Sequence, residues 1–279
     1  MRSKKKKLQE LTIKDNFMFA AVMMDPENCR GFLEMLLEIP IARVEVSYEK
    51  SMVYRPEYKG VRLDVFAKDE HNTRYNVEMQ VAKRALERRS RYYHGQMDME
   101  MLLSGMDYRQ LPNAYVIFIC DFDPFGQGRY LYTVKKRCQE LSELPYEDGN
   151  TTMFLSTCGK NEDEVPKPLV NFLRFVKGSG ITCEDAFTKQ LQRSVDLVKR
   201  NRDMEERFMV LDDMMEDARR EGKAEGKTEA VLDILEELGV VPEEIRERIL
   251  DEPDPDVLGG WIRLAVKSGS VEQFIKEAF

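Results

Sequence analysis

Two alternating stretches of the chain decide its fold: Val61-Arg-Leu-Asp-Val-Phe-Ala-Lys68 and Arg74-Tyr-Asn-Val-Glu-Met-Gln80. Apolar side chains recur at every second position in both stretches, which is typical of half-buried β-strands. The polar residues 69–73 lie between them and predict a turn. We therefore expect a β-hairpin with one apolar face, formed by Val61, Leu63, Val65 and Ala67 on the first arm and Tyr75, Val77, Met79 and Val81 on the second.

The opposite face of this hairpin carries three polar side chains, Asp64, Glu78 and Gln80. If the hairpin is symmetric about His71, Asp64 lies directly opposite Glu78, with the two Cβ atoms about 4.5–5.5 Å apart. Two carboxylates at this separation repel each other unless a proton or a cation lies between them. Mg²⁺ is a hard cation that prefers oxygen ligands and would remove the conflict, and other divalent cations are compatible with the same site.

A cation held by two carboxylates is typical of metal-dependent phosphodiesterases, because it polarises a phosphoryl oxygen and lowers the pKa of an attacking water. Gln80 lies on the same face as Glu78, where its amide could orient that water or contact a phosphate oxygen. The alternative is an ordinary solvated strand face with surface carboxylates. Arg62 points to the same side as Asp64 and would either contact DNA or neutralise a carboxylate.

A basic stretch, Arg88-Arg-Ser-Arg-Tyr-Tyr-His-Gly-Gln96, follows the hairpin and lies in a predicted helix over residues 86–103. Arginines bind phosphates through charge-assisted hydrogen bonds, and a tyrosine ring can stack on a base or sugar. A solvated helix face is the alternative, although the nearby carboxylates favour DNA binding. Of the adjacent Tyr92 and Tyr93, we expect one to pack inward and the other to face the groove. The candidate DNA-binding residues are Arg62, Arg88, Arg89, Arg91 and Tyr92.

The formal net charge of −8 argues at first sight against a nucleic acid partner. However, residues 203–237 contain 13 acidic and five basic residues, whereas residues 83–91 contain one acidic and five basic residues. A basic patch can therefore bind phosphate locally while the acidic charge lies in another part of the chain. The chain has only two histidines, which excludes mechanisms built on several imidazoles.

Five segments carry a resemblance to a known family: Lys14-Asp-Asn-Phe-Met-Phe19, Gly60-Val-Arg-Leu-Asp64, Tyr75-Asn-Val-Glu-Met-Gln80, Arg89-Ser-Arg-Tyr-Tyr93 and Phe118-Ile-Cys-Asp-Phe-Asp123. On these segments the chain resembles the PD-(D/E)xK nuclease superfamily, in particular the transposase-like branch that includes the recombination-promoting nucleases. The matching segments extend from about residue 11 to residue 158. The resemblance implies an α/β, restriction-endonuclease-like core, in which helices flank a mixed β-sheet, and Mg²⁺-dependent cleavage of DNA.

The resemblance also assigns roles by position. Asp64 and Glu78 match the metal-binding acids, and both are implied to be catalytic together with Gln80. Gln80 stands where the superfamily has a lysine, a departure shared by this branch that removes a positive charge from the site. Asp15 is the candidate accessory acid, and the alternative for it is a helix cap or a partner for a basic side chain.

The chain is long enough for one main domain and a smaller appendage. We expect a nuclease-like domain over residues 1–200, a charged helical linker over residues 201–230 and a small helical tail module over residues 231–279. No apolar run is long enough to span a bilayer, and the basic N-terminus lacks a signal-peptide core, so we expect a cytoplasmic protein with no membrane partner. The tail is a candidate for self-association as a homodimer.

The function predicted from these observations is that of a Mg²⁺-dependent DNA endonuclease, a hydrolase of phosphodiester bonds linked to transposition or recombination. The alternative is a catalytically inactive DNA-binding or protein-interaction module derived from a mobile element. The uncharged Gln80 and the net negative charge favour this alternative.

Overall fold

The computed structural model describes residues 6–52, 61–178 and 185–279, with the side chains of residues 48–52 and 61–62 left out. The chain divides into two compact units, Met1–Met204 and Glu205–Phe279. Each unit has its own core and is described separately. Among the described residues, no helix is long and apolar enough to cross a membrane.

The first unit is built on a mixed six-stranded sheet in the order β1-β2-β3-β4-β6-β5. The strands β3, β4 and β6 run parallel, and the remaining pairs are antiparallel. Helices flank this sheet, so the predicted α/β class is confirmed. The strands are β1 (Val44–Met52), β2 (Val61–Asp69), β3 (Arg74–Gln80), β4 (Ala114–Cys120), β5 (Leu131–Val134) and β6 (Asn150–Ser156).

The hairpin of β2 and β3 has the predicted register. Val65 pairs with Val77, and Lys68 pairs with Arg74, so the pairing is centred on His71. The Asp69 carboxylate closes the turn by accepting hydrogen bonds from the backbone nitrogens of His71 (2.9 Å) and Thr73 (2.8 Å).

Strand β3 ends at Gln80, and the next residue, Val81, is 62% exposed. The prediction that Val81 extends the apolar face of the hairpin is therefore wrong. The chain leaves the sheet here because it has reached the edge at which the parallel strands end. The neighbouring strand β4 ends at the equivalent position, Cys120, which pairs with Gln80.

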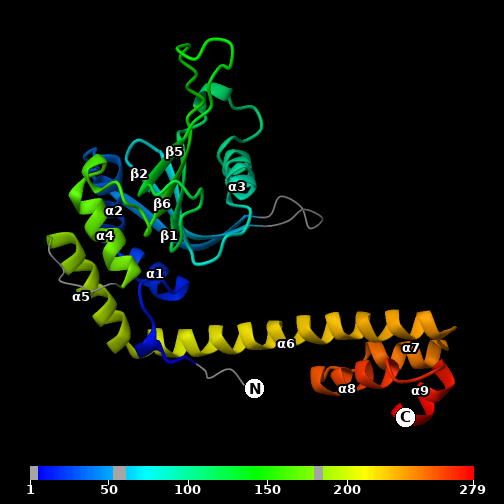
Figure 1. Ribbon diagram of the computed structural model, residues 1–279. Helices are drawn as coiled ribbons and strands as arrows, with labels where there is room; N and C mark the ends of the chain where they lie inside the picture. Colours follow the sequence, from blue (N-terminus) through cyan, green and yellow to red (C-terminus); the bar gives the residue numbers. More distant parts are fainter. Residues whose placement is uncertain (1–5, 53–60, 179–184) are drawn as a thin grey trace. The chain divides into compact units, whose positions relative to one another are not determined.

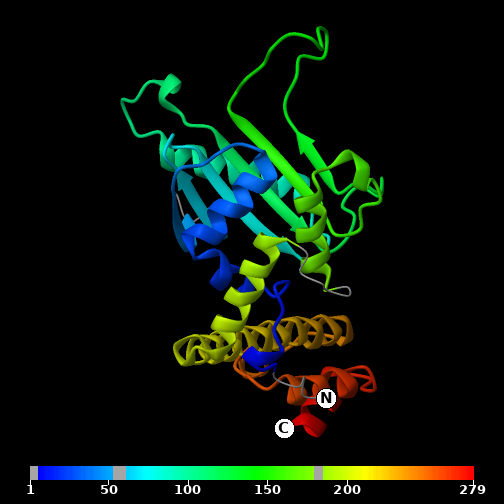
Figure 2. The same cartoon turned by 90° about the vertical axis from the view of Figure 1, so that its left-hand side faces the viewer.

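Helices cover both faces of the sheet (Figures 1 and 2), with α3 (Leu86–Met101) on one face and α2 (Pro26–Leu37) and α4 (Lys167–Lys177) on the other. Tyr93 and Met97 of α3 pack in one buried cluster with Phe118 and Phe154 of the sheet. Strand β4 is a continuous apolar run, and all of its residues from Val116 onward are buried, as expected for a central parallel strand. The other helices of the unit are α1 (Asn16–Met23), α2 (Pro26–Leu37), α4 (Lys167–Lys177) and α5 (Ala186–Arg200).

The first two helices are separated at Asp25 and Pro26. Asp25 caps α2 by accepting a hydrogen bond from the Glu27 nitrogen at 2.9 Å, and Pro26 occupies the first helical position. Helix α2 ends at Glu38, whose backbone is left-handed with φ 55°. Between these two ends, Phe32 of α2 contacts Phe172 of α4, with ring centroids 5.1 Å apart.

The parallel strands bring their carboxyl ends to one edge of the sheet. The backbone nitrogen of Asp121 donates to the Gln80 carbonyl (2.9 Å), and that of Thr157 donates to the Cys120 carbonyl (3.0 Å). Residues that follow β4 and β6 therefore lie beside the end of β3. This edge is where the candidate site forms.

The second unit is helical, with a buried core that includes Val231, Leu235, Ile249, Leu258 and Phe274. Helix α6 is continuous through the predicted boundary between linker and tail at residue 230, and it carries two glycines without a break. The division into three parts stays a prediction. The helices of this region are α6 (Arg202–Leu238), α7 (Glu243–Leu250), α8 (Pro255–Ala265) and α9 (Val271–Ala278).

Candidate active site

Strands β2 and β3 bring the predicted carboxylate pair together. The backbone nitrogen of Asp64 donates to Glu78 Oε1 at 3.3 Å, and the backbone nitrogen of Met79 donates to Asp64 Oδ2 at 3.4 Å. Each carboxylate thus lies against the backbone of the other strand. This is the juxtaposition that the hairpin symmetry predicts, while the roles of the two acids stay predictions.

The face that carries the pair is covered rather than solvated. Glu78 is only 2% exposed and Gln80 8%, while Asp64 is half-buried. Burial is the largest cause that raises the pKa of Glu78, to about 8, and the negative charge of Asp64 raises it further. Arg89 acts in the opposite direction. A solvated strand face is therefore the wrong interpretation for Glu78.

Among the described side chains, Arg89 forms an ion pair with Glu78. Its Nη2 atom donates to Glu78 Oε2 (3.2 Å) and to the Tyr93 hydroxyl (2.7 Å), and its Nη1 atom donates to Gln80 Oε1 (2.8 Å). The guanidinium also lies over the rings of Tyr93 and Phe118, 5.3 and 5.6 Å from their centroids. Helix α3 carries three of the four predicted DNA-binding arginines and places one of them, Arg89, at the carboxylates.

Gln80 links the guanidinium to the carboxylate. Its Oε1 atom accepts from Arg89, and its Nε2 atom donates to Glu78 Oε2 at 3.4 Å. This orientation of the amide follows from Arg89, because a guanidinium has only donors and must therefore face the amide oxygen of Gln80. The predicted site residues Asp64, Glu78 and Gln80 therefore lie together with Arg89 in one charged cluster, in which Glu78 and Gln80 are buried and Asp64 and Arg89 are half-buried.

Residues 13–144 match the family model of the PD-(D/E)XK nuclease family transposases. The matched segment contains the whole cluster, from the carboxylate pair to Arg89. The predicted resemblance is thereby confirmed over this segment, and it supports a role related to nucleases and transposases. No curated protein and no solved structure matches the chain.

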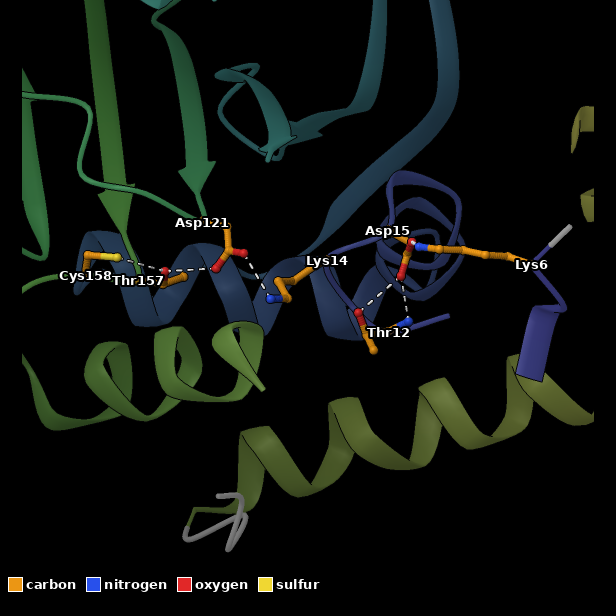
Figure 3. A network of polar contacts seen from close by, with 7 residues as sticks. All are labelled: Lys6, Thr12, Lys14, Asp15, Asp121, Thr157 and Cys158. Carbon is orange, nitrogen blue, oxygen red and sulfur yellow. Dashed lines mark hydrogen bonds and ion pairs between the residues drawn. The ribbon is translucent and has the colours of Figure 1, made fainter. Parts of the chain in front are cut away.

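Two residues of the transposase-like segment were missed as members of the site, although they lie in the quoted motif Lys14-Asp-Asn-Phe. Asn16 Nδ2 lies 3.5 Å from Asp64 Oδ2. Lys14 Nζ forms an ion pair with Asp121 Oδ2 at 2.9 Å, and Asp121 Oδ1 accepts from the Thr157 hydroxyl at 3.1 Å (Figure 3). The motif contained a signal for both residues, because Lys14 and Asn16 are the polar neighbours of Asp15 in the sequence.

Asp15, the predicted accessory acid, belongs to a different group of contacts. Figure 3 shows it with Lys6 and Thr12, while the neighbouring Lys14 points toward Asp121. Its carboxylate accepts from the Thr12 nitrogen (2.8 Å) and the Lys6 ammonium (2.9 Å). Burial raises the pKa of Asp15, but these hydrogen bonds outweigh it and lower the pKa overall. A catalytic role for Asp15 stays a prediction.

The other predicted DNA-binding residues differ in their surroundings. Arg88 and Arg91 are exposed on α3, and Tyr92 is 36% exposed while Tyr93 packs inward. The prediction that one tyrosine packs inward is thus confirmed. Arg62 lies on β2, but its side chain is outside the described residues. The DNA-binding roles of these residues stay predictions.

The donors of the cluster suit a hard divalent cation. In the described part of the chain, no group of three or more His, Cys, Asp or Glu side chains could hold a metal ion. At the candidate site the hairpin offers two carboxylates, those of Asp64 and Glu78. Mg²⁺ is commonly bound through one or two carboxylates, with water and substrate phosphate as its other ligands. The residues present thus fit this class of cation.

Proposed function

We propose that this chain is a metal-dependent DNA endonuclease that hydrolyses phosphodiester bonds during transposition or recombination. One observation carries the proposal, namely the pair of half-buried Asp64 and buried Glu78 within a segment that matches nuclease family transposases. Burying two carboxylates side by side costs stability unless a cation compensates them. The protein retains this arrangement, which supports a functional use of the pair.

In the proposed reaction, Asp64 and Glu78 hold Mg²⁺ or a similar divalent cation. When bound, such a cation polarises the phosphoryl oxygen and lowers the pKa of a water molecule. Glu78 must lose its proton to act as a ligand, and the nearby Arg89 favours that ionised form. Helix α3 shields the buried side of the pair from bulk water, which strengthens electrostatic contacts there.

The exposed basic residues of α3 would hold the DNA. Arg88 and Arg91 can bind backbone phosphates, and Tyr92 can stack on a base or sugar. Contacts of this kind carry little sequence information and weaken with salt. We therefore expect the affinity for DNA to fall as the salt concentration rises.

The decisive experiment is cleavage of supercoiled plasmid by the purified protein with Mg²⁺ and with EDTA. Asp64→Asn keeps the shape of the side chain but removes a charged ligand, so we expect at least a 100-fold loss of nicking, about 3 kcal/mol in barrier height. The matched control is Asp107→Asn, at an exposed carboxylate paired with Arg109. Nicking of equal rate in EDTA, or undiminished nicking by Asp64→Asn, would contradict the proposal.

A second candidate function is DNA binding without cleavage. The uncharged Gln80 at the carboxylate pair favours it, because a lysine there would supply charge to the transition state. Calorimetric titration with Mg²⁺ separates the two functions. An inert binding module has no need of a cation site, whereas the nuclease should bind Mg²⁺ and lose that binding in Asp64→Asn.

A further inference from the structure

The three arginines near the start of α3 have different surroundings. Arg88 and Arg91 are exposed, as expected for side chains that meet a DNA backbone from solvent. The Arg89 side chain is only 29% exposed and lies against Glu78 and Gln80. The surroundings of Arg89 therefore indicate a different role from that of Arg88 and Arg91.

Neutral groups hold the Arg89 guanidinium more closely than the carboxylate does. Its bonds to Gln80 Oε1 and the Tyr93 hydroxyl are 2.8 and 2.7 Å, whereas its contact with Glu78 Oε2 is 3.2 Å. A charge-assisted bond to a carboxylate is usually about 2.7–2.9 Å long. Gln80 and Tyr93 thus make the two shorter hydrogen bonds to the guanidinium, and the ion pair with Glu78 adds a longer contact.

We propose that Arg89 is a catalytic residue that binds a non-bridging oxygen of the scissile phosphate, and that Gln80 positions it. This inference rests on the proposed nuclease function. In the hydrolysis, a water oxygen forms a bond to phosphorus while the bond from phosphorus to one nucleoside oxygen breaks. One water proton ends on the leaving oxygen, and the other remains with the new phosphate monoester or passes to solvent. Arg89 keeps its protons and stabilises the negative charge that develops on the phosphoryl oxygens.

Gln80 suits this positioning role in a way that a lysine would not. A lysine ammonium has three donors and no acceptor, so it could not accept the hydrogen bond from Arg89 Nη1. It would also place a second positive charge beside the guanidinium. Glutamine at position 80 and arginine at position 89 therefore form a matched pair, in which the charge comes from the helix and not from the strand.

The first test separates DNA binding from turnover. In Arg89→Gln we expect single-turnover cleavage to fall about 10²–10³-fold, the range for removing one transition-state donor. Affinity for a DNA duplex, measured by fluorescence anisotropy in EDTA, should stay within about threefold, and calorimetric Mg²⁺ binding should be retained. In Arg88→Gln the loss should instead appear in the dissociation constant. Arg109→Gln, at an exposed arginine outside the site, is the matched control for the substitution.

The second test is rescue by exchange of the charge. Gln80→Lys combined with Arg89→Gln returns one positive charge to the site from the strand, so the double variant should cleave at least tenfold faster than Arg89→Gln alone. Tyr93→Phe keeps the buried ring but removes the hydroxyl that holds Arg89, and should lower turnover about tenfold without changing affinity for DNA. If Arg89→Gln does not fold, Tyr93→Phe still tests the proposed role of Arg89.

The outcomes distinguish the two proposals. A wild-type protein that does not cleave DNA with any divalent cation overturns both the nuclease function and the role of Arg89. Metal-dependent cleavage that survives in Arg89→Gln overturns the role of Arg89 only. The same holds if Arg89→Gln and Arg88→Gln weaken DNA binding equally, or if the exchange of charge gives no rescue.

Discussion

Helix α3 contacts two buried polar groups on the same face of the sheet, one charged and one neutral. The charged group joins Arg89 to Glu78 and Gln80, and the neutral group joins His94 to Thr152, whose side-chain atoms Nε2 and Oγ1 are 3.0 Å apart. Burial acts on both. It raises the pKa of Glu78 to about 8 and lowers the pKa of His94 to about 4, with Lys136 adding to the second shift.

The two groups differ in the charges that oppose the effect of burial on the pKa values of Glu78 and His94. Beside Glu78, the guanidinium of Arg89 favours the ionised form, and a bound divalent cation would favour it further. Around His94, burial and Lys136 lower the pKa, and Asp148 and a hydrogen bond with Asn150 oppose them only in part, so the imidazole that contacts Thr152 is neutral. A neutral pair is sufficient for packing, whereas retention of a charged cluster under the same helix indicates a function that needs the charge.

The largest expected difference is in catalysis. Glu78→Gln removes a charged ligand of the proposed cation site, so we expect turnover to fall about 10³-fold, or about 4 kcal/mol in barrier height. Thr152→Val in the neutral group should leave turnover within about threefold. Single-turnover cleavage of plasmid measures both. Similar losses in the two variants would remove the functional distinction between the groups.

The charged group should also set the pH dependence of stability without metal. The pKa of Glu78 is higher in the folded protein, at about 8, than its ordinary value of 4.5, so the folded state binds more protons in this interval. The stabilisation is fully present below about pH 4.5 and is lost as the pH rises through about 8. We expect the free energy of unfolding in EDTA to fall over this interval by about 3–5 kcal/mol, measured by urea denaturation.

Glu78→Gln should remove this slope, because the amide does not titrate. Glu87→Gln, at an exposed position of the same helix, is the matched control and should keep it. Saturating Mg²⁺ should flatten the slope in the wild-type protein, since binding of the cation favours ionised Glu78. A slope that persists in Glu78→Gln would assign it to other groups.

Much of the charged group was predictable because it depends on local rules. Alternation over the two strands and a polar turn fixed the register, and the register placed Asp64 opposite Glu78. The burial of Glu78 was not predictable in this way. It depends on how α3 packs across the sheet, which is a tertiary contact. The sequence of the strand is the same whether a helix or water covers its polar face.

The position of Arg89 at the carboxylates was not predicted. Leu86, Tyr93 and Met97 define the buried side of α3, and Arg89 lies on that side one turn before Tyr93, whereas Arg88 and Tyr92 are exposed. The apolar stripe contained this signal. By contrast, the contact of Lys14 with Asp121 joins residues 107 positions apart, and local patterns carry no information about it.

The neutral group should respond to acid, in the opposite direction to Glu78. The pKa of His94 is about 4 in the folded protein and 6.5 ordinarily, so the unfolded state takes up a proton first as the pH falls. Stability from this group is present above pH 6.5 and is lost toward pH 4, by about 2–3 kcal/mol. His94→Gln should remove that loss. His71→Gln, at the exposed histidine of the hairpin turn, should retain it, and equal acid curves for the two variants would contradict the assignment.

The smallest expected effect concerns the hydrogen bond within the neutral group. Thr152→Val preserves the shape of the side chain but leaves His94 Nε2 without its partner, which should lower the free energy of unfolding by about 1 kcal/mol. The cost is small because both partners are neutral. Tyr93→Phe removes a hydroxyl bonded to a charged guanidinium, and such bonds contribute about 1.5–3 kcal/mol. Urea denaturation of the two variants at pH 7 compares the groups directly, and a larger cost for Thr152→Val would reverse their proposed order.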